Sequence, residues 1–258
     1  MIGDAITRLR TVVAPDKESV GKIIDRLQTL SLQFKQHMAG SRTQLQDYAD
    51  IFKAIELPEI AHEFQEDATF ARMRVAGPNP MLIKGISQLP NNFPLSAAQY
   101  AQVMAGDSLS AASKEGRLYL LDYAQLQAMV DSPASLDPLK VVYAPIALFA
   151  LPKGESEITP VAIQCGQDPA KFPLLLKPAP DQVGEHFGWL MAKTVVQVAD
   201  GNYHELFVHL ARTHLVLEAF VVATHRQLAD QHPLNILLIP HFEGSLFINN
   251  AAAGSLIA

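Results

Sequence analysis

The stretch NYHELFVHLARTHLVLEAFVVATHRQLADQ occupies positions 202–231 and decides how the rest of the chain can fold. It contains no proline or glycine, so no residue in it interrupts a helix strongly. Large apolar side chains fall on every side of the helix that it would form: Leu206, Phe207, Val208, Leu210, Leu215, Val216, Leu217, Phe220, Val221 and Val222. A helix that is apolar all round is typical of a protein interior. We therefore predict a long, buried central helix surrounded by other helices.

The residues on either side predict where this helix begins and ends. We expect a break at Asp200-Gly201-Asn202, after a preceding helical pattern from Val183, with Asn202 as the N-cap. Glu205, three residues later, would complete a capping box. At the other end, Pro233 stops the helix after Gln231.

Histidines recur through this region at fixed spacings. His204, His209, His214, His232 and His241 are separated by four, four, seventeen and eight residues. Neutral imidazole is the commonest protein ligand for a transition metal, so the array indicates a metal site. Positions five apart on a regular α-helix diverge by roughly 140°, so His209 and His214 could bind one ion only if the helix widened locally. We predict a π-type bulge between them. The alternative is buried histidines that are hydrogen-bonded to carbonyls and carboxylates.

The apolar patterns in the rest of the chain predict a mainly α fold with a small antiparallel β-sheet region in the middle. Residues 1–66 carry helical periodicity and form a helical N-terminal region. Short apolar runs at 117–122, 141–151 and 160–165 predict strands, and Pro152-Lys153-Gly154 predicts the turn between the last two.

Composition excludes several classes of function. The net charge is −6 and no Lys/Arg cluster occurs, so we expect no nucleic-acid partner. Cys165 is the single cysteine and charge at Asp4 disfavours an export signal, so we expect a cytoplasmic location. No run reaches the roughly 18 uninterrupted apolar residues of a membrane span, so we expect no transmembrane segment.

The histidine spacing resembles the signature of the lipoxygenases, the non-haem iron dioxygenases of polyunsaturated fatty acids. Short flanking motifs resemble the family too, namely Trp189-Leu190-Met191-Ala192-Lys193, His209-Leu210-Ala211-Arg212-Thr213-His214 and His232-Pro233-Leu234. Upstream, Asp67-Ala68-Thr69-Phe70-Ala71-Arg72 and Gly77-Pro78-Asn79-Pro80 are similar to the segment that leads into the catalytic domain. We therefore interpret 67–258 as a partial lipoxygenase catalytic domain, of the bacterial type without the lipid-binding β-sandwich domain.

The resemblance implies a site. Non-haem iron (Fe2+/Fe3+) would be bound by His209 and His214, with no catalytic residue beyond these ligands. Outer-shell positions would be His204, Glu205 and Glu218, while packing or hydrogen bonding is the favoured role of His204, His232 and His241. The substrate pocket would include Leu210, Ala252 and Leu256.

The implied activity is insertion of dioxygen into a polyunsaturated fatty acid to give a hydroperoxide. In the family, ferric iron with a bound hydroxide removes a hydrogen atom, and O2 adds to the resulting radical. Further iron ligands, including a C-terminal Ile, lie far downstream of the histidine array, whereas this sequence stops at Ala258. We therefore expect the missing C-terminal half to supply ligands, and the chain alone to be inactive. The alternatives are a non-catalytic acyl-binding or interaction protein that retains the fold, and an unrelated metal-storing helical protein.

Overall fold

The computed structural model describes residues 56–132 and 141–254, together with the single positions 25, 29, 32, 47, 49 and 52. Most of the predicted helical N-terminal region, 1–66, and the predicted pocket residue Leu256 therefore lie outside the described residues. The chain divides into two compact units, His62–Leu217 and a second unit formed by Met1–Ala61 with Glu218–Ala258. Each unit is described by itself.

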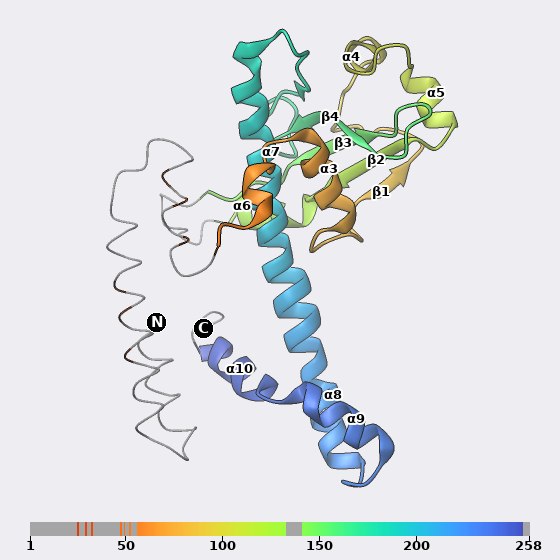
Figure 1. The fold of residues 1–258 in the computed structure, drawn as a ribbon. Helices are drawn as coiled ribbons and strands as arrows, with labels where there is room; N and C mark the ends of the chain where they lie inside the picture. Colours follow the sequence, from red (N-terminus) through yellow and green to blue (C-terminus); the bar gives the residue numbers. More distant parts are fainter. Residues whose placement is uncertain are drawn as a thin grey trace. The chain divides into compact units, whose positions relative to one another are not determined.

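A five-stranded antiparallel sheet forms the centre of the unit His62–Leu217, as predicted (Figure 1). Its strands follow one another in chain order: β1 (Lys84–Ile86), β2 (Leu118–Asp122), β3 (Ile146–Ala150), β4 (Thr159–Gln164) and β5 (Leu175–Leu176). The three predicted runs coincide with β2, β3 and β4. The predicted turn is confirmed, because the Glu155 amide donates to the Pro152 carbonyl at 3.1 Å and Gly154 has a φ of 86°. The sequence pattern missed β1 and β5, which are short.

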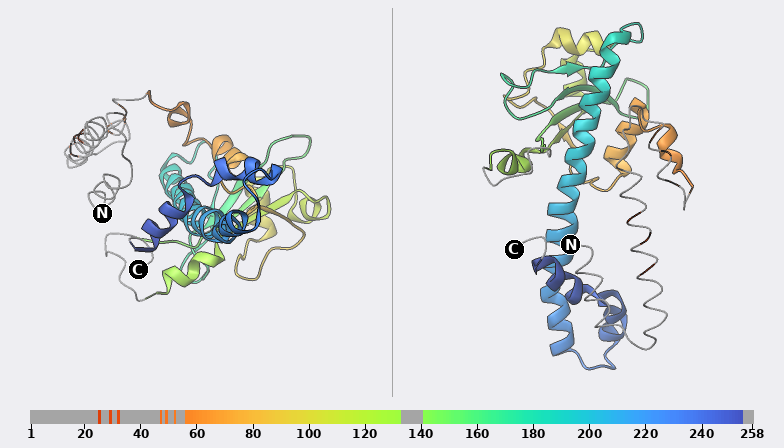
Figure 2. Two further views of the ribbon diagram at one scale, coloured as in Figure 1. Left: turned by 90° about the horizontal axis from the view of Figure 1, so that it is seen from below. Right: turned by 90° about the vertical axis from the view of Figure 1, so that its left-hand side faces the viewer.

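Helices cover both faces of this sheet. One face is covered by α3 (Asp67–Ala76) and α7 (Val183–Tyr203), whose ribbons can be followed in Figure 2. These helices contribute Phe70, Trp189, Val196 and other residues to a core with Phe149 and Ile163. The other face packs against α4 (Ala97–Val103) and α5 (Leu109–Lys114). Every residue of β3 is buried because both faces are covered. Shorter elements are η2 (Glu59–His62), η3 (Ala124–Leu126) and α6 (Gln127–Val130).

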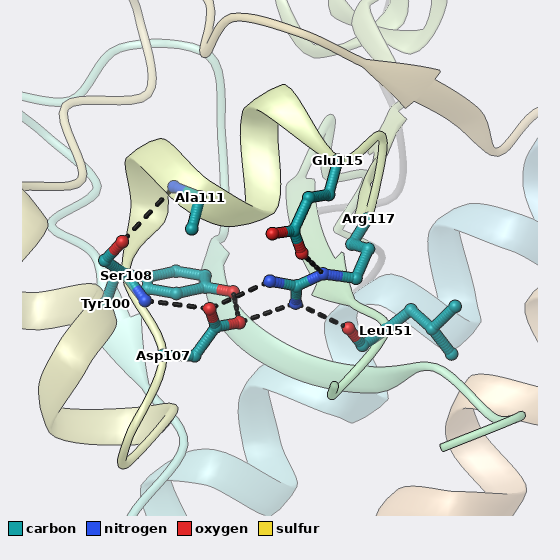
Figure 3. Close-up of polar contacts among 7 residues, drawn as sticks. All are labelled: Tyr100, Asp107, Ser108, Ala111, Glu115, Arg117 and Leu151. Atoms are coloured by element: carbon teal, nitrogen blue, oxygen red, sulfur yellow. Dashed lines mark hydrogen bonds and ion pairs between the residues drawn. The ribbon is translucent and has the colours of Figure 1, made fainter. Parts of the chain in front are cut away.

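An ion-pair cluster ties the α4–α5 connection to the start of β2 (Figure 3). The Arg117 guanidinium donates to both carboxylate oxygens of Asp107, at 2.6 and 2.8 Å, to Glu115 at 2.8 Å and to the Leu151 carbonyl at 2.9 Å. The Tyr100 hydroxyl also donates to Asp107, at 3.2 Å. Burial, together with the Asp107 charge, raises the pKa of Tyr100 to about 12. Several hydrogen bonds therefore compensate for taking the two charges out of water.

The long helix exists but differs from the prediction at both ends. It is continuous over Val183–Gln227, as α7, the π-helix η4 (His204–Leu215) and α8 (Val216–Gln227). The predicted break at Asp200-Gly201-Asn202 and the N-cap role of Asn202 are therefore wrong. The Asp200 side chain bonds to other segments of the unit and does not compete with its own helix. At the far end the helix stops at Gln227, and His232 is the N-cap of the next helix, α9 (Pro233–Phe242), which α10 (Ser245–Ala252) follows.

The prediction that this helix is buried holds only in part. Trp189, Ala192, Val196 and Ala199 of α7 are buried against the sheet. In contrast, η4 contains no fully buried residue. Several large apolar side chains at the end of η4 and in α8 are exposed, including Leu215, Val216, Leu217 and Phe220. An all-apolar pattern indicates that side chains need a partner, but it does not identify the polypeptide that supplies it.

Among the described residues one helix, Val183–Gln227, is long and apolar enough to cross a membrane by length and composition alone. The core helix of a soluble protein passes the same test, so counting uninterrupted apolar residues does not separate the two cases. The absence of a transmembrane segment therefore stays a prediction.

Candidate metal centre

The π-helix η4 carries both predicted metal ligands, which confirms the predicted widening of the helix between them. It spans His204–Leu215 and is therefore longer than a single-turn bulge. Its i→i+5 pattern places residues five apart over one another. The side chains repeat this pattern, because the Thr213 hydroxyl donates to the Val208 carbonyl at 2.9 Å.

His209 and His214 face one another through the same ring nitrogen. Their Nε2 atoms are 3.1 Å apart, and the rings meet edge to face with centroids 4.8 Å apart. Histidine nitrogens bind divalent metals at about 2.1 Å, so this separation subtends about 95° at a shared ion. Two neighbouring positions around an octahedral ion subtend a similar angle. The geometry of the pair therefore fits two ligands of one transition-metal ion.

Glu205 lies on the far side of the His209 ring. His209 Nδ1 is 2.9 Å from Glu205 Oε2, one turn earlier in η4. The carboxylate accepts the Nδ1 hydrogen, which leaves the Nε2 lone pair directed towards His214. The hydrogen bond from His209 lowers the pKa of Glu205. Glu205 is exposed, yet its carboxylate can hold the His209 ring in the orientation that a metal ligand needs.

The other predicted outer-shell residues have different neighbours. His204 Nδ1 is 3.2 Å from Asn79 Oδ1, and the His204 ring lies nearly parallel to that of His209, at 13° and 6.1 Å. The Glu218 carboxylate accepts a hydrogen bond of 2.8 Å from Asn249, within the other unit of the chain. The outer-shell role of Glu218 stays a prediction.

The described part of the chain provides two metal-binding side chains at this point. No group of three or more His, Cys, Asp or Glu residues that could hold a metal occurs among residues 56–132 and 141–254. Two histidines are one ligand short of the facial triad that non-haem iron enzymes use. The pair fits iron as part of a larger ligand set.

The predicted pocket residues belong to both units of the chain, and Leu256 lies outside the described residues. Leu210 is half-buried in η4, and Ala252 is half-buried in α10 of the other unit. Two cavities of about 420 Å³ lie within the unit His62–Leu217, one beside Asp67 and Trp189 and the other between α3 and β1, and neither is lined by Leu210, His209 or His214. The substrate pocket therefore stays a prediction.

A buried polar cluster around Asp200, four residues before the π-helix begins, was missed by the sequence interpretation. Asp200 in α7 accepts hydrogen bonds from Tyr123 at 2.7 Å and from Asn79 at 2.9 Å, and pairs with Arg74 at 3.2 Å. Burial, together with the Asp200 charge, raises the pKa of Tyr123. A charged residue such as Asp200 inside an apolar helix indicates polar partners elsewhere in the chain, because buried polar groups are nearly always paired.

Comparisons with known proteins identify the family. The family model described as Lipoxygenase matches residues 13–258. The chain belongs to the lipoxygenase family. A linoleate 9/13-lipoxygenase of Pseudomonas aeruginosa is 51% identical over 257 residues, which cover 97% of this chain and 37% of that protein. The human polyunsaturated fatty acid lipoxygenase ALOX15B is 37% identical over 222 residues, 84% of this chain and 32% of its own length.

Solved structures give the same result for the fold. A calcium-dependent 11R-lipoxygenase matches with a TM-score of 0.75 and 30% identity, over 85% of this chain and 32% of its own. A coral 8R-lipoxygenase matches with a TM-score of 0.69 and 31% identity, over 83% of this chain and 31% of its own. The chain thus spans about a third of the length of these relatives.

Proposed function

We propose that this chain forms part of the catalytic domain of an iron-dependent lipoxygenase, which inserts dioxygen into a polyunsaturated fatty acid to give a hydroperoxide. The observation that carries the proposal is the 3.1 Å separation of the His209 and His214 Nε2 atoms within a π-helix. This arrangement suits two ligands of one ion and is not produced by a regular α-helix.

Each residue of the centre has a distinct task in this proposal. His209 and His214 hold the iron through Nε2, and Glu205 keeps the Nδ1 hydrogen of His209 in place. Leu210, Ala252 and Leu256 contact the acyl chain. Iron, when bound, supplies the one-electron oxidation that removes a hydrogen atom from the methylene group between two cis double bonds. O2 adds to the carbon radical, which apolar neighbours surround, and the resulting peroxyl radical takes back one electron and one proton to give the hydroperoxide.

The remaining iron ligands, in this proposal, come from polypeptide outside these 258 residues, and the chain alone is inactive. Two observations support this. The ligand pair falls short of a facial triad, and the match to the Pseudomonas aeruginosa relative covers 37% of that protein. A cytoplasmic location without a membrane span completes the proposal and is supported by the single cysteine and by the packing of α7 on the sheet.

A chimera tests the proposal directly. These 258 residues replace the matching segment of the Pseudomonas aeruginosa lipoxygenase, so that the relative supplies everything else. We expect the purified chimera to contain near-stoichiometric iron and to convert linoleate into conjugated-diene hydroperoxide, followed by ultraviolet absorbance. His209→Ala and His214→Ala should each abolish iron binding and turnover.

The control is His225→Ala, which removes an exposed histidine in α8 and should leave both properties intact. A folded chimera without iron or diene, beside an active parent enzyme, would contradict the proposal. Fatty-acid binding by the chain alone that survives both histidine substitutions would then favour the acyl-binding alternative.

A further inference from the structure

Asp200 is the centre of a buried hydrogen-bond network that joins three segments of the unit His62–Leu217. Its carboxylate accepts from Tyr123, which follows β2, and from Asn79, which follows α3, while Arg74 of α3 pairs with it. All four side chains are nearly or fully buried, with Asp200 only 3% exposed. A buried carboxylate is tolerated because these donors satisfy it.

Asn79 differs from the other donors because it also binds the backbone. Its amide nitrogen donates to the Asp200 carbonyl as well as to the Asp200 carboxylate, both at 2.9 Å. The same carbonyl accepts the backbone N–H of His204, which is the C-cap of α7 and the first residue of η4. Asn79 therefore contacts the junction at which the α-helix becomes a π-helix.

The same side chain also fixes the His204 ring. Since the Asn79 amide nitrogen donates to Asp200, its oxygen must accept, and it lies 3.2 Å from His204 Nδ1. His204 must therefore carry its hydrogen on Nδ1. The His204 ring in turn lies nearly parallel to that of His209. One residue from outside the helix thus holds both the backbone and the first side chain of η4.

We propose that Asn79 is a positioning residue, which fixes where η4 begins and thereby the direction in which the His209–His214 pair faces. This inference rests on the proposed function. If the α-to-π junction moved by one residue, that residue would exchange the roughly 100° turn of an α-helix for the smaller turn of a π-helix, and the following side chains would rotate by roughly 20° relative to the sheet. Gly201 and Asn202 have weak helical preference, so the local sequence does not by itself fix the position of this junction. The restraint must come from the tertiary contact.

The first test uses the 258-residue chain without metal. Asn79→Leu keeps a similar volume but removes all three hydrogen bonds, and Asn79→Ala removes the side chain. The matched control is Tyr123→Phe, which takes one hydrogen bond from the same carboxylate and leaves His204 untouched. The readouts are the His204 tautomer, from two-bond proton–nitrogen correlations at mildly alkaline pH, and amide hydrogen exchange across 204–215.

We expect His204 to carry its hydrogen on Nδ1 in the natural chain and in Tyr123→Phe, but not in either Asn79 variant. Amide exchange across η4 should become about tenfold faster in the Asn79 variants than in Tyr123→Phe. If Asn79→Ala does not fold, Asn79→Leu decides. An unchanged tautomer, or equal acceleration in Tyr123→Phe, would overturn the inference, because a general loss of stability would then explain the data.

The second test measures iron in the chimera described above. Asn79→Leu should weaken iron affinity about tenfold, as expected for a group that orients a ligand through its neighbours, while Tyr123→Phe should retain it. Equal iron affinity in all three proteins would overturn the positioning role. If the unsubstituted chimera itself bound no iron, the proposed function would fail, whereas the tautomer and exchange measurements would still decide whether Asn79 sets the start of η4.

Discussion

The Nε2 atoms of His209 and His214 lie 3.1 Å apart although the two residues are five positions apart in one continuous helix. When no ion is present, one ring donates its N–H to the other, and when an ion is bound both nitrogens present lone pairs to it. The π-helix is therefore the element that converts a sequence spacing into a ligand pair. Its stability and its anchoring should control metal binding.

The Thr213 hydroxyl should contribute to the stability of the π-helix. It donates to the Val208 carbonyl at 2.9 Å, five residues earlier, and so reinforces the i→i+5 pattern. We expect Thr213→Val to lower the free energy of unfolding by about 0.5–1 kcal/mol, measured by urea denaturation. Thr213→Ser keeps the hydroxyl and is the control. Equal stability of the two variants would show that the bond contributes nothing.

Glu205 should tune the affinity of the ligand pair. Replacing it with Gln keeps an acceptor for His209 Nδ1 but removes the negative charge. We expect Glu205→Gln to weaken iron binding by the chimera about tenfold, measured by competition with a chelator. Glu185→Gln changes the net charge equally at an exposed position in the first turn of α7 and should have no effect. The prediction is wrong if both substitutions change iron affinity alike.

The Asp107–Arg117 pair should make stability depend on pH. Hydrogen bonds from Arg117 hold the pKa of Asp107 at about 2, below its ordinary value of 3.8. Since the folded pKa is the lower one, the ionised carboxylate stabilises the fold fully above about pH 4, and this contribution disappears as the pH falls through about 2. It amounts to about 2 kcal/mol.

Asp107→Asn provides the measurement. At neutral pH we expect it to lower the free energy of unfolding by about 2–3 kcal/mol, because Arg117 keeps its charge and loses a buried partner. In urea denaturation at a series of pH values, the difference from the natural chain should narrow between about pH 4 and pH 2. A difference that stays constant over this range would mean that Asp107 does not titrate there.

Gly166 should be required because the Phe172 ring occupies the space that a side chain would need. A Cβ atom at Gly166 would lie 2.3 Å from Phe172 Cδ2. We expect Gly166→Ala to destabilise the protein by about 1–3 kcal/mol, measured as a lower Tm. Adding Phe172→Leu should restore part of the loss. Strictly additive effects of the two substitutions would argue against this contact as the cause.

Much of the fold was readable from local patterns. Strands β2, β3 and β4 were predicted because short apolar runs between turn residues suit a sheet that is covered on both faces. The π-helix was predicted because His209 and His214 could converge in no regular helix. The strands β1 and β5 were missed because three and two residues carry too little pattern.

The polar cluster around Asp200 shows where local reading failed. Asp200-Gly201-Asn202 has the composition of a turn, yet α7 passes through it because Asn79 and Tyr123 bind the Asp200 side chain. These partners come from more than 70 positions earlier in the chain, at separations of 121 and 77 residues. Helix propensity is a weak preference that several buried hydrogen bonds override.

The sequence by itself determined the lipoxygenase family, the central helix and the five-residue spacing of His209 and His214, because spacing along one helix depends only on neighbouring residues. Tertiary structure alone decided that the helix runs unbroken past Asp200, where its α-helical part gives way to η4, and which of its faces meet the sheet. The physical reason is that hydrogen bonds from distant segments, including that from Asn79, stabilise a backbone conformation that the local residues leave undecided.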